Sequence, residues 1–519
     1  MYVAFGNAVQ KVFCRKIGGG VEIMRKIPDI IRDADLDYKK KRDKLAYQAE
    51  NLLQYVNVSE KTKNYMKQYI ICDLNEGNAP YRPRYVLPDY EKFIRNGSEF
   101  LNITPPKDFY EAVNALFIIY SYVPSITGFP VYLGNVDTLL EPFVGTVTEA
   151  EVEKLLKMFM TNIDRVISDA FVHMNIGPFE TKVGNIILKL ERELKQAVPN
   201  LSLKFSKDTS ENFIKEAIKT SLEVGKPYFI NHEELLGVLG HDYGIASCYN
   251  TLKIGGGSHT LARMNLKKLA DISNDKEDFL YNKLSDAVDS LCELINKRSE
   301  FLVEESLYFE SSFLAKEGLI DIDKFTSMAG IFGLYECVEK LSNGLKMGHD
   351  DYANRLAEDI IKRTYEILSS HKGSYCGGTN GKIGFHAQSG IDTDVDTTAG
   401  VRIKIGEEPI VFEQIRQQAS LQKYFDAGVS DIYIFESTAR QNVEGVFKII
   451  KGAMKNNMRI LTVNTSDSEL IRISGYLVKR SDIEKNLKNE NLDNRESTVK
   501  IATESVKKQD VLKRRVRFK

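Results

Sequence analysis

The C-terminal third of the chain contains a strand, helix, strand pattern that constrains the fold more than any other feature. Two short runs rich in Ile, Val, Tyr and Phe, residues 432–435 and 460–463, flank a helical pattern from about residue 438 to 455. A connection of this length suits a right-handed crossover between parallel strands. Because parallel sheets need helices on both faces, the pattern predicts an α/β structure.

Helical patterns fill much of the remaining chain. Within the first 120 residues, apolar side chains recur at steps of three and four among dense charges, and Asp108 is expected to cap a helix that runs to about residue 122. Longer amphipathic patterns cover residues 149–171 and 278–307. At about 150 residues per domain, a chain of 519 residues forms about three folding units or one large enzyme around a single barrel.

Composition excludes several functional classes. The 71 Lys and Arg residues balance 72 Asp and Glu residues, so nucleic acid is not expected as the main partner. No apolar run reaches the roughly 18 residues of a membrane span, and the N-terminus lacks a secretory signal pattern, so we expect a cytoplasmic protein without membrane contact. The last thirteen residues hold seven Lys or Arg and are expected to form a solvated end.

Two glycine-rich segments, residues 225–263 and 369–409, lie between the helical patterns. Glycine beside polar and titratable residues is typical of backbone that approaches a ligand. Neither the Gly-x-Gly-x-x-Gly nor the Walker motif is present, so nucleotide binding by those devices is not indicated. The seven histidines lack ligand spacing and no Cys-x-x-Cys pair occurs, so no metal site is predicted.

The run Arg472-Ile473-Ser474-Gly475-Tyr476 follows the second strand of the crossover. Taken alone, glycine between serine and tyrosine could be a turn. The run also resembles the motif of glycyl radical enzymes, in which Arg, a branched apolar residue, a small residue, Gly and Tyr lie near the C-terminus. Loss of a Cα hydrogen leaves a radical delocalised over the flanking amide and carbonyl groups, and a side chain would hinder this. The resemblance implies that Gly475 stores a radical.

In this superfamily a cysteine on an opposed loop receives the radical as a thiyl. Cys248 is the best candidate, because its surroundings resemble the thiyl-loop region of anaerobic ribonucleotide reductases: a Pro-Tyr-Phe-x-Asn stretch, the cysteine, then a glycine-rich loop entering a strand with Asn-Leu. Cys376 lies in the second glycine-rich segment and stays open, whereas Cys337 has helical surroundings. Free cysteines in helical patterns are most simply core residues, which is the interpretation for Cys14, Cys72 and Cys292.

Further landmarks narrow the resemblance. Residues 132–143 resemble a Gly-Arg-x-Asp-Gln-x-Leu-x-Pro-Tyr stretch of the pyruvate formate-lyase branch, but Asn135 and Thr138 stand where that branch has Arg and Gln. Anaerobic ribonucleotide reductases carry a four-cysteine zinc site before the radical glycine, yet no cysteine follows Cys376. In its length and its mixture of these features, the chain resembles the YjjI-type glycine radical proteins most.

This resemblance implies an α/β fold of a particular kind, a ten-stranded α/β barrel of two half-barrels surrounded by helices. Gly475 and Cys248 would lie on opposed loops that meet inside the barrel. Residues 1–124 would form a mainly helical N-terminal layer, and residues 125–465 the barrel with the cysteine loop. Residues 466–519 would form the C-terminal glycyl radical segment and the basic tail.

The implied activity is anaerobic and oxygen-sensitive. A radical on Gly475 would generate a thiyl on Cys248, which abstracts a hydrogen from an unidentified small organic substrate. The chain itself would bind no cofactor, because a separate radical S-adenosylmethionine activase with a [4Fe-4S] cluster installs the radical, and a homodimer is the habit of the superfamily. Three alternatives stay open: a zinc-less enzyme like anaerobic ribonucleotide reductase, carbon–carbon bond cleavage as in pyruvate formate-lyase, and a catalytically silent scaffold.

Four polar residues are candidate substrate contacts or proton relays. Asn231 closes the Pro-Tyr-Phe-x-Asn stretch, His232 follows it, and His259 comes after a triple glycine. A loop histidine is more often a surface or hydrogen-bonding residue than a substrate contact. Asp137 belongs to the pyruvate formate-lyase-like landmark, although it could instead cap a helix that begins at Thr138.

Overall fold

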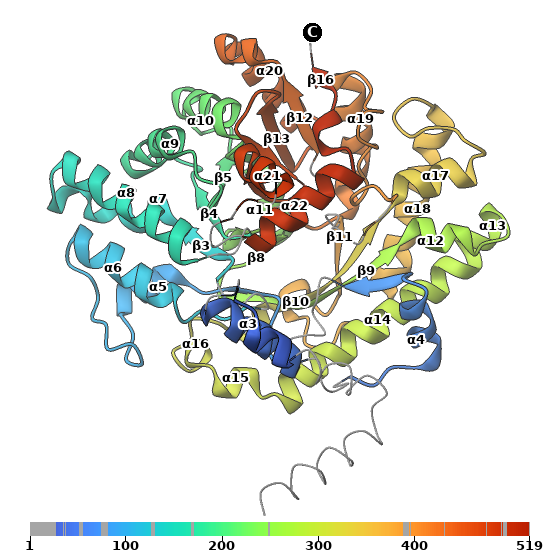
Figure 1. Ribbon diagram of the computed structural model, residues 1–519, viewed down its shortest axis with the longest axis horizontal. Coiled ribbons are helices and arrows are strands. Elements are labelled where there is room, and N and C mark those ends of the chain that lie inside the picture. Colours follow the sequence, from blue (N-terminus) through green and yellow to red (C-terminus); the bar gives the residue numbers. More distant parts are fainter. Residues whose placement is uncertain are drawn as a thin grey trace, which may run out of the picture.

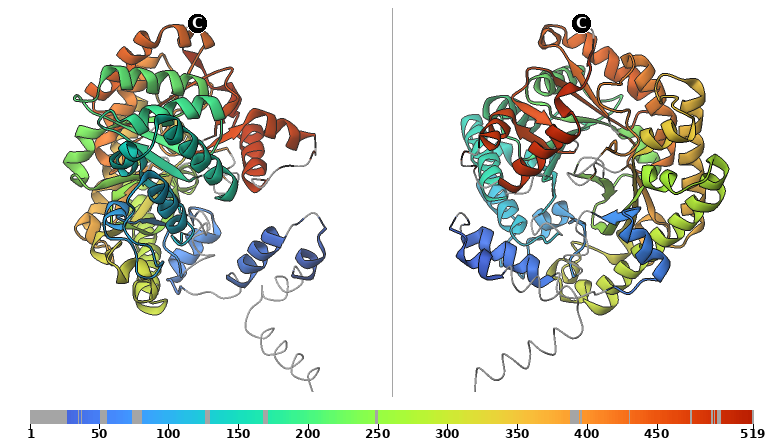
Figure 2. Two further views of the ribbon diagram at one scale, coloured as in Figure 1. Left: turned by 90° about the vertical axis from the view of Figure 1, so that its left-hand side faces the viewer. Right: turned by 45° about the vertical axis from the view of Figure 1, so that its right-hand side comes forward.

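The computed structural model describes residues 27–34, 36, 38–50, 56–73, 81–125, 130–167, 171–247, 250–387, 394, 396–429, 431–473, 475–488, 490, 492 and 496–517. Figure 1 shows strands at the centre of the protein and a ring of helices around them. The helices α21 (Arg480–Leu487) and α22 (Glu496–Lys508) lie across one end of this barrel (Figures 1 and 2). The C-terminal segment therefore covers one opening of the barrel.

Two hydrogen-bonded sheets form the wall of the barrel. The first has the strand order β16-β12-β13-β6-β5-β4-β3, and the second has the order β1-β9-β10-β11, with β2 also paired to β9. The strands of the first sheet are β3 (Tyr132–Asn135), β4 (His173–Ile176), β5 (Asn200–Phe205), β6 (Tyr228–Asn231), β12 (Ile432–Phe435), β13 (Ile460–Thr465) and β16 (Val516–Arg517). Those of the second are β1 (Ile71–Asp73), β2 (Tyr85–Leu87), β9 (Gly256–Asn265), β10 (Phe325–Phe332) and β11 (Gly384–Ala387).

Ten of these strands form two sets of five, β2 to β6 and β9 to β13. Within the sets, the pairs β3–β4, β4–β5, β5–β6, β9–β10, β10–β11 and β12–β13 are parallel. The sets meet at antiparallel junctions, β6 with β13 and β2 with β9. The prediction of a ten-stranded α/β barrel made of two half-barrels is confirmed.

The crossover predicted near the C-terminus is also confirmed. Strands β12 and β13 are parallel, with Ile432 opposite Thr462, and α20 (Val443–Lys455) connects them. The predicted start of this helix near residue 438 is a 3-10 turn, Ser437–Gln441, and Asn442 caps α20 by accepting the N–H of Gly445. Packing of α20 through Val446, Phe447, Ile450, Ala453 and Met454 buries its apolar face.

Helices cover the outer faces of both sheets. In α8 a capping box joins Thr148 and Glu151, and the helix ends at Val166 rather than near residue 171. The pattern predicted over residues 278–307 is α14 with a π-helical turn at each end, Phe279–Lys283 and Phe301–Glu305. The α-helices of residues 38–278 are α3 (Tyr38–Glu50), α4 (Glu60–Lys67), α5 (Tyr90–Asn96), α6 (Phe109–Tyr120), α7 (Val136–Leu140), α8 (Glu149–Val166), α9 (Lys182–Leu194), α10 (Glu211–Val224), α11 (His232–Leu239), α12 (Leu266–Asp271) and α13 (Lys276–Asp278).

Later in the chain, α14 (Leu284–Glu300) packs against β9 and β10, and α18 (Asp351–Ser370) packs against α14. The remaining helices are α15 (Tyr308–Ser311), α16 (Phe313–Lys316), α17 (Leu334–Leu341) and α19 (Val411–Leu421). Among the described residues, no helix is long and apolar enough to cross a bilayer.

The ends of the chain differ from expectation in two ways. The predicted helical layer, residues 1–124, also contributes the strands β1 and β2, so the N-terminal segment takes part in the barrel wall. The predicted solvated basic end is exposed at Lys507, Lys508, Lys513 and Arg515, but Arg514 is half-buried and Arg517 is buried, and both bind backbone carbonyl groups. Strand β16 pairs with β12, and the Arg517 guanidinium donates to the carbonyl of Pro409 at 2.6 Å. These arginines satisfy backbone carbonyl groups that burial would otherwise leave without donors.

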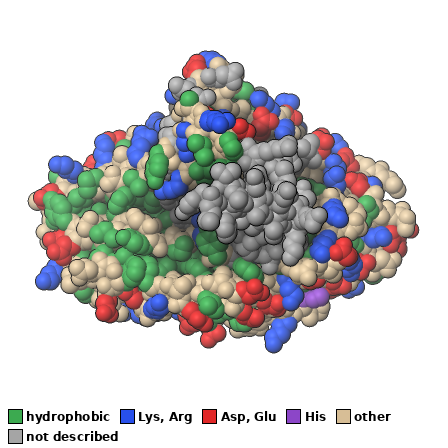
Figure 3. Space-filling view, turned by 60° about the horizontal axis from the view of Figure 1, so that its bottom comes forward, with side chains coloured by type: hydrophobic (Ala, Val, Ile, Leu, Met, Phe, Trp, Pro, Cys, Tyr) green, Lys and Arg blue, Asp and Glu red, His purple; other side chains and the backbone are tan. Residues whose placement is uncertain are grey.

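The outer surface carries apolar side chains beside the barrel. Figure 3 shows hydrophobic side chains gathered on the face turned toward the bottom of Figure 1. Phe100 is 60% exposed, stacks on Phe313 of α16 at a centroid distance of 4.3 Å, and meets the ring of Tyr122 at 6.1 Å. An apolar groove of about 380 Å³ also runs between α6 and α8, lined by Phe117 and Met158 among others.

Candidate active site

Gly475 lies in the turn of a short hairpin formed by β14 (Leu470–Arg472) and β15 (Leu477–Lys479). The two strands are antiparallel, with Arg472 opposite Leu477. The N–H of Ile473 donates to the carbonyl of Tyr476 at 3.0 Å and closes the turn. Gly475 is buried. We call this element the glycine hairpin.

Strand β6 holds the glycine hairpin through one tyrosine. The Tyr228 hydroxyl donates to the Gly475 carbonyl at 2.8 Å, and its side chain is fully buried. The Arg472 guanidinium lies over the Tyr228 ring at 4.0 Å, and it donates to the Tyr228 hydroxyl oxygen and to the Gly225 carbonyl. A cationic donor in a buried site makes strong hydrogen bonds. The arginine of the motif therefore fixes the tyrosine that binds the glycine.

A histidine on the neighbouring strand backs this tyrosine. The rings of His173 and Tyr228 lie 5.4 Å apart, and His173 Nε2 lies 2.6 Å from the Ser202 hydroxyl on β5. Burial, together with the positive charges of Arg472 and Lys226, lowers the pKa of His173 well below its ordinary value. His173 is therefore neutral near pH 7.

A buried ion pair lies deeper in the same region. Lys226 Nζ lies 2.7 Å from the Glu191 carboxylate and donates to the Pro199 carbonyl at 2.6 Å. Both side chains of the pair are fully buried. Burial raises the pKa of Glu191 and lowers that of Lys226, while the attraction between the two opposes both shifts. Such a pair is costly to break, because the remaining charge would lack a partner.

A second hairpin, β7 (Tyr243–Ala246) with β8 (Asn250–Lys253), carries the predicted thiyl cysteine in its connection. Ala246 pairs with Asn250, and Ser247 begins the connection with a left-handed backbone, φ 64°. The other two residues of the connection, Cys248 and Tyr249, lie outside the described residues. We call this element the cysteine hairpin.

The cysteine hairpin is fixed to the inner face of the first sheet. The Asn175 amide on β4 donates to the Ile245 carbonyl at 3.0 Å, and its oxygen accepts the Ile245 N–H at 2.8 Å. Lys204 on β5 donates to the Tyr243 carbonyl at 3.0 Å, with its ammonium 4.4 Å from that ring's centroid. Burial lowers the pKa of Lys204 to about 8. The backbone of the cysteine hairpin thus supplies the hydrogen-bond partners of Asn175 and Lys204, which point into the barrel.

Contacts on the other edge of the hairpin reach the second sheet. The Asn250 amide donates to the hydroxyl of Tyr85 on β2 at 2.9 Å, and β8 packs beside β9. Gly244 lies directly against the Tyr132 ring, where a Cβ would come within 2.5 Å of a ring carbon. A side chain at this position would push the hairpin away from β3. The cysteine hairpin therefore lies between the two half-barrels.

One strand connects the two hairpins. His173 and Asn175 are two residues apart on β4, so their side chains point to the same face, whereas Met174 and Ile176 pack in the core with the helices. His173 contacts the tyrosine that binds Gly475, and Asn175 binds the cysteine hairpin. Inside the barrel, β4 therefore binds the cysteine hairpin directly and contacts the glycine hairpin through Tyr228.

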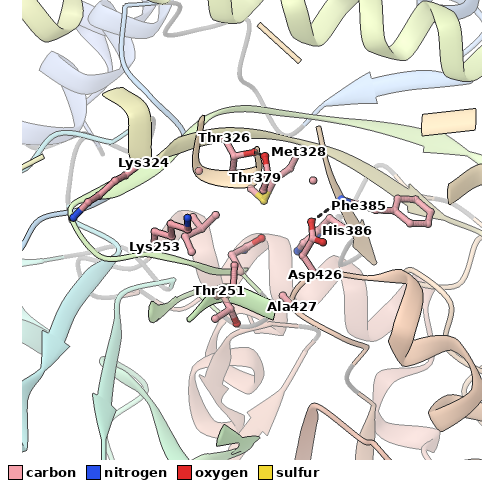
Figure 4. A pocket seen from close by; sticks show the side chains of 15 residues that line it. Thr251, Lys253, Lys324, Thr326, Met328, Thr379, Phe385, His386, Asp426 and Ala427 are labelled. Atoms are coloured by element: carbon pink, nitrogen blue, oxygen red, sulfur yellow. Dashed lines mark hydrogen bonds between the residues drawn. The ribbon is translucent and has the colours of Figure 1, made fainter. Parts of the chain in front are cut away.

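A small cavity separates the cysteine hairpin from the second sheet (Figure 4). Its volume is about 20 Å³, enough for roughly one water molecule. Thr251 of β8, Thr326 of β10, His386 of β11 and Asp426 line it with polar groups. Asp426 accepts the N–H of Phe385 at 3.1 Å, and desolvation raises its pKa to about 6.

A polar row also crosses the second sheet above this cavity. The strand register places Gly330 between Arg263 and His386, so the middle position has no side chain. Arg263 donates to the Asp394 carboxylate at 2.7 Å, and both side chains are fully buried. The guanidinium also lies over the Phe332 ring at 4.4 Å. Such buried charges are held only with well-placed partners.

Comparison with known proteins decides the family. Residues 36–517 match the family model described as "Glycyl radical enzyme YjjI-like". The chain belongs to the YjjI-like glycyl radical enzyme family. It is 38% identical over 471 residues to the "Uncharacterized protein YjjI" of Escherichia coli K12, covering 89% of this chain and 90% of that protein. A protein of Haemophilus influenzae is 38% identical over 479 residues, covering 90% and 93% of the two chains.

Solved structures show the same fold at low sequence identity. The anaerobic ribonucleotide reductase from Thermotoga maritima superposes with a TM-score of 0.71 at 12% identity, covering 91% of this chain and 94% of that one. Hydroxyproline dehydratase from Clostridioides difficile gives a TM-score of 0.66 at 12% identity, covering 96% and 89%. The glycyl radical enzyme barrel thus persists where sequence has diverged almost completely.

Two of the predicted substrate contacts, Asn231 and Asp137, form hydrogen bonds with backbone groups in the structure. Asn231 caps α11 and donates to the carbonyls of Met454 and Met458, each at 3.1 Å. Asp137 is fully buried within α7 and accepts the N–H groups of Thr138 and Gly177, both at 2.8 Å. Burial raises the pKa of Asp137 to about 7.

The two predicted histidines lie in different places. His259 on β9 packs against the Phe325 ring at 5.1 Å, and its Nε2 lies 3.0 Å from the Tyr375 carbonyl. Burial lowers its pKa to about 4, so Nε2 carries a proton and donates. His232 follows β6, and its Nδ1 lies 2.6 Å from the hydroxyl of Tyr243 in the cysteine hairpin. Substrate contact by any of the four residues stays a prediction.

The described cysteines are buried as predicted, although Cys72 lies in a strand and not in the helical pattern expected for it. Cys72, Cys292 and Cys337 are buried in β1, α14 and α17, and burial raises the pKa of the Cys337 thiol. Cys376 is also buried, at the start of a 3-10 turn, with its thiol 3.5 Å from the Ser374 carbonyl. Cys14 lies outside the described residues. Within the described residues, no group of three or more His, Cys, Asp or Glu side chains could hold a metal ion.

Sequence reasoning missed the inner-wall residues that hold the hairpins. His173, Asn175 and Lys204 lie on strands whose alternate residues are apolar and face the helices. Polar side chains alternating with apolar ones in a strand are the signal that marks such a face. The partners of these side chains lie tens of residues further along the chain, in the cysteine hairpin for Asn175 and Lys204 and on β5 and β6 for His173, so only the fold reveals them.

Proposed function

We propose that the chain is a glycyl radical enzyme that works through a thiyl radical on Cys248. The observation that carries the proposal is the common support of the two hairpins on the inner face of β4. Radical transfer needs near contact between the two reacting groups and shelter from water. Two observations support the proposal: Gly475 is buried, and Tyr228 links it to the strand that binds the hairpin containing Cys248.

In this proposal each step moves one hydrogen atom. A radical S-adenosylmethionine activase removes a hydrogen atom from Gly475 Cα. The Gly475 radical takes the hydrogen of the Cys248 thiol, which restores glycine and leaves a thiyl. The thiyl abstracts a hydrogen from a carbon of the substrate and becomes a thiol again. After rearrangement or cleavage, the product radical takes that hydrogen back, so no net oxidant or reductant is consumed by the transfer.

The substrate in this proposal is a small organic molecule, and Gly475 and Cys248 are the residues that carry the radical. His232 is retained as a candidate relay because its ring reaches Tyr243 in the cysteine hairpin. The proposal includes no metal and no cofactor bound to the chain apart from the radical itself. A homodimer is included by analogy with the superfamily.

Anaerobic activation followed by electron paramagnetic resonance tests the proposal. The activated wild-type chain should show a glycyl doublet, and Gly475→Ala should not. Brief exposure to air should cut the activated wild-type chain near Gly475. A doublet that persists in Gly475→Ala, or no doublet with an activase proven active, would refute it. A Cys248→Ser variant should keep the doublet and lose turnover, and retained turnover would point to Cys376.

Ribonucleotide reduction is the second candidate, because the T. maritima reductase shares the barrel over nearly the whole chain. At 12% identity this similarity concerns the fold alone. Titration calorimetry with ribonucleoside triphosphates separates the candidates: micromolar binding would favour the reductase, and no heat would favour a substrate unrelated to nucleotides.

A further inference from the structure

The carbonyl group of Gly475 receives a hydrogen bond whose donor is itself polarised by a cation. Tyr228 donates to the Gly475 carbonyl at 2.8 Å, and the Arg472 guanidinium donates to the same tyrosine oxygen. Tyr228 is fully buried and Arg472 is 1% exposed, so water competes little with either bond. Hydrogen bonds in series strengthen one another, most of all where the local dielectric is low.

This arrangement has a chemical consequence if Gly475 carries a radical. The unpaired electron on Cα is shared between the amide nitrogen, which donates electron density, and the carbonyl, which accepts it. A donor on the carbonyl oxygen stabilises the resonance form in which spin density lies on oxygen. Without that donor, more of the spin density stays on Cα.

We propose that Arg472 and Tyr228 form a relay that stabilises the glycyl radical by drawing spin density onto the Gly475 carbonyl oxygen. Tyr228 is the positioning residue that acts on Gly475, and Arg472 acts through Tyr228. The inference rests on the proposed function, because it concerns the radical on Gly475. It adds to that function a reason why the arginine of the motif stands three residues before the glycine.

The Tyr228 hydroxyl donates to Gly475 and accepts from Arg472, and the packing of its ring is separate from these two bonds. Its ring packs between the Arg472 guanidinium at 4.0 Å and the His173 ring at 5.4 Å, so ring orientation does not depend on the hydroxyl. His173 bonds Ser202 rather than the tyrosine hydroxyl. Replacing the tyrosine by phenylalanine therefore removes the donor to Gly475 and keeps the packing.

The test compares radical spectra of full-length variants activated anaerobically. Tyr228→Phe should give a glycyl doublet with a larger splitting by the Cα hydrogen, because spin density returns to Cα. The equilibrium between the glycyl radical and the cysteine thiyl should shift toward the thiyl by up to about fivefold, because ordinary glycine also accepts this bond and only the part that strengthens in the radical counts. Incorporation of 3-fluorotyrosine at position 228 makes the phenol a stronger donor and should decrease the splitting.

Tyr120→Phe is the matched control. Tyr120 is 1% exposed, and its hydroxyl donates at 2.6 Å to the carbonyl of Leu133, which lies on β3 and not in the glycine hairpin. This variant loses a buried phenol-to-carbonyl bond and should keep the wild-type splitting. An unchanged splitting in Tyr228→Phe would overturn the relay while leaving the glycyl radical itself intact. If Tyr228→Phe yields no radical, the fluorotyrosine spectrum decides, and a wild-type splitting there overturns the relay. Absence of a doublet in the wild type refutes the proposed function instead.

Discussion

Replacement of Asn175 by alanine should separate radical storage from radical transfer. Asn175 is fully buried and bonds both the carbonyl and the N–H of Ile245, so Asn175→Ala leaves two buried backbone groups without these partners. Each unsatisfied group costs about 1–3 kcal/mol. The free energy of unfolding should therefore fall by about 2–6 kcal/mol, less if a water fills the gap.

The functional effect of this change should appear in one step only. The glycine hairpin is held by Tyr228 and not by Asn175, so the yield of glycyl radical should stay near the wild-type value. The cysteine hairpin loses its bonds to β4, so transfer of hydrogen between Gly475 and Cys248 should slow by at least about tenfold, the cost of a slightly displaced reacting group.

Exchange into deuterated water measures this transfer. The Cys248 thiol exchanges its hydrogen with solvent, so each reversible transfer places deuterium on Gly475 Cα, and the glycyl doublet collapses to a narrow signal. The collapse should be slower in Asn175→Ala than in the wild type. Gln422→Ala is the matched control, since Gln422 bonds both backbone groups of Val429 at 2.7 and 2.9 Å, away from the hairpins. Equal collapse rates in all three proteins would refute the role given to Asn175.

Three further changes test the wall around the hairpins. Lys226→Met should lower the free energy of unfolding by about 3–5 kcal/mol, because it leaves the Glu191 carboxylate buried without its partner. The double variant with Glu191→Leu should recover most of this loss in chemical denaturation, and no recovery would contradict the prediction. Burial raises the pKa of Asp137 from about 4 to about 7, so the folded chain binds this proton more tightly than the unfolded chain. Stability should therefore fall as pH rises from 4 to 7, and Asp137→Asn should flatten this slope in thermal melts. Arg514 donates to the carbonyls of Arg472 and Ile473 at 2.8 and 2.6 Å. Arg514→Ala should therefore loosen the glycine hairpin and speed cleavage of the activated chain by air, and an unchanged cleavage rate would contradict this role of Arg514.

Local pattern was sufficient for some parts of the site. The crossover from β12 through α20 to β13 follows from alternating and helical periodicity, and the structure keeps it within a few residues. The turn at Gly475 was predicted from the sequence, because glycine between serine and tyrosine is typical of a turn. A helical environment for Cys337 was equally readable, because neighbouring residues in the sequence remain neighbours on a helix.

Other parts depend on residues that are distant in sequence. The basic C-terminal end looked solvated because charge favours water, yet Arg514 and Arg517 bind backbone carbonyls of the glycine hairpin and of the segment before α19. The predicted helical layer supplied β1 and β2, since three-residue strands are too short to show alternation.

The sequence by itself determined the features on which the proposed chemistry rests: a glycine in a motif like that of glycyl radical enzymes, a set of free cysteines, and the alternation of strands and helices that builds a barrel. The tertiary structure decided which groups act on that glycine. Tyr228 lies on β6, 247 residues before Gly475, and Asn175 lies 70 residues before the hairpin it binds. Hydrogen bonds depend on distance in space, so barrel closure alone brings these partners together.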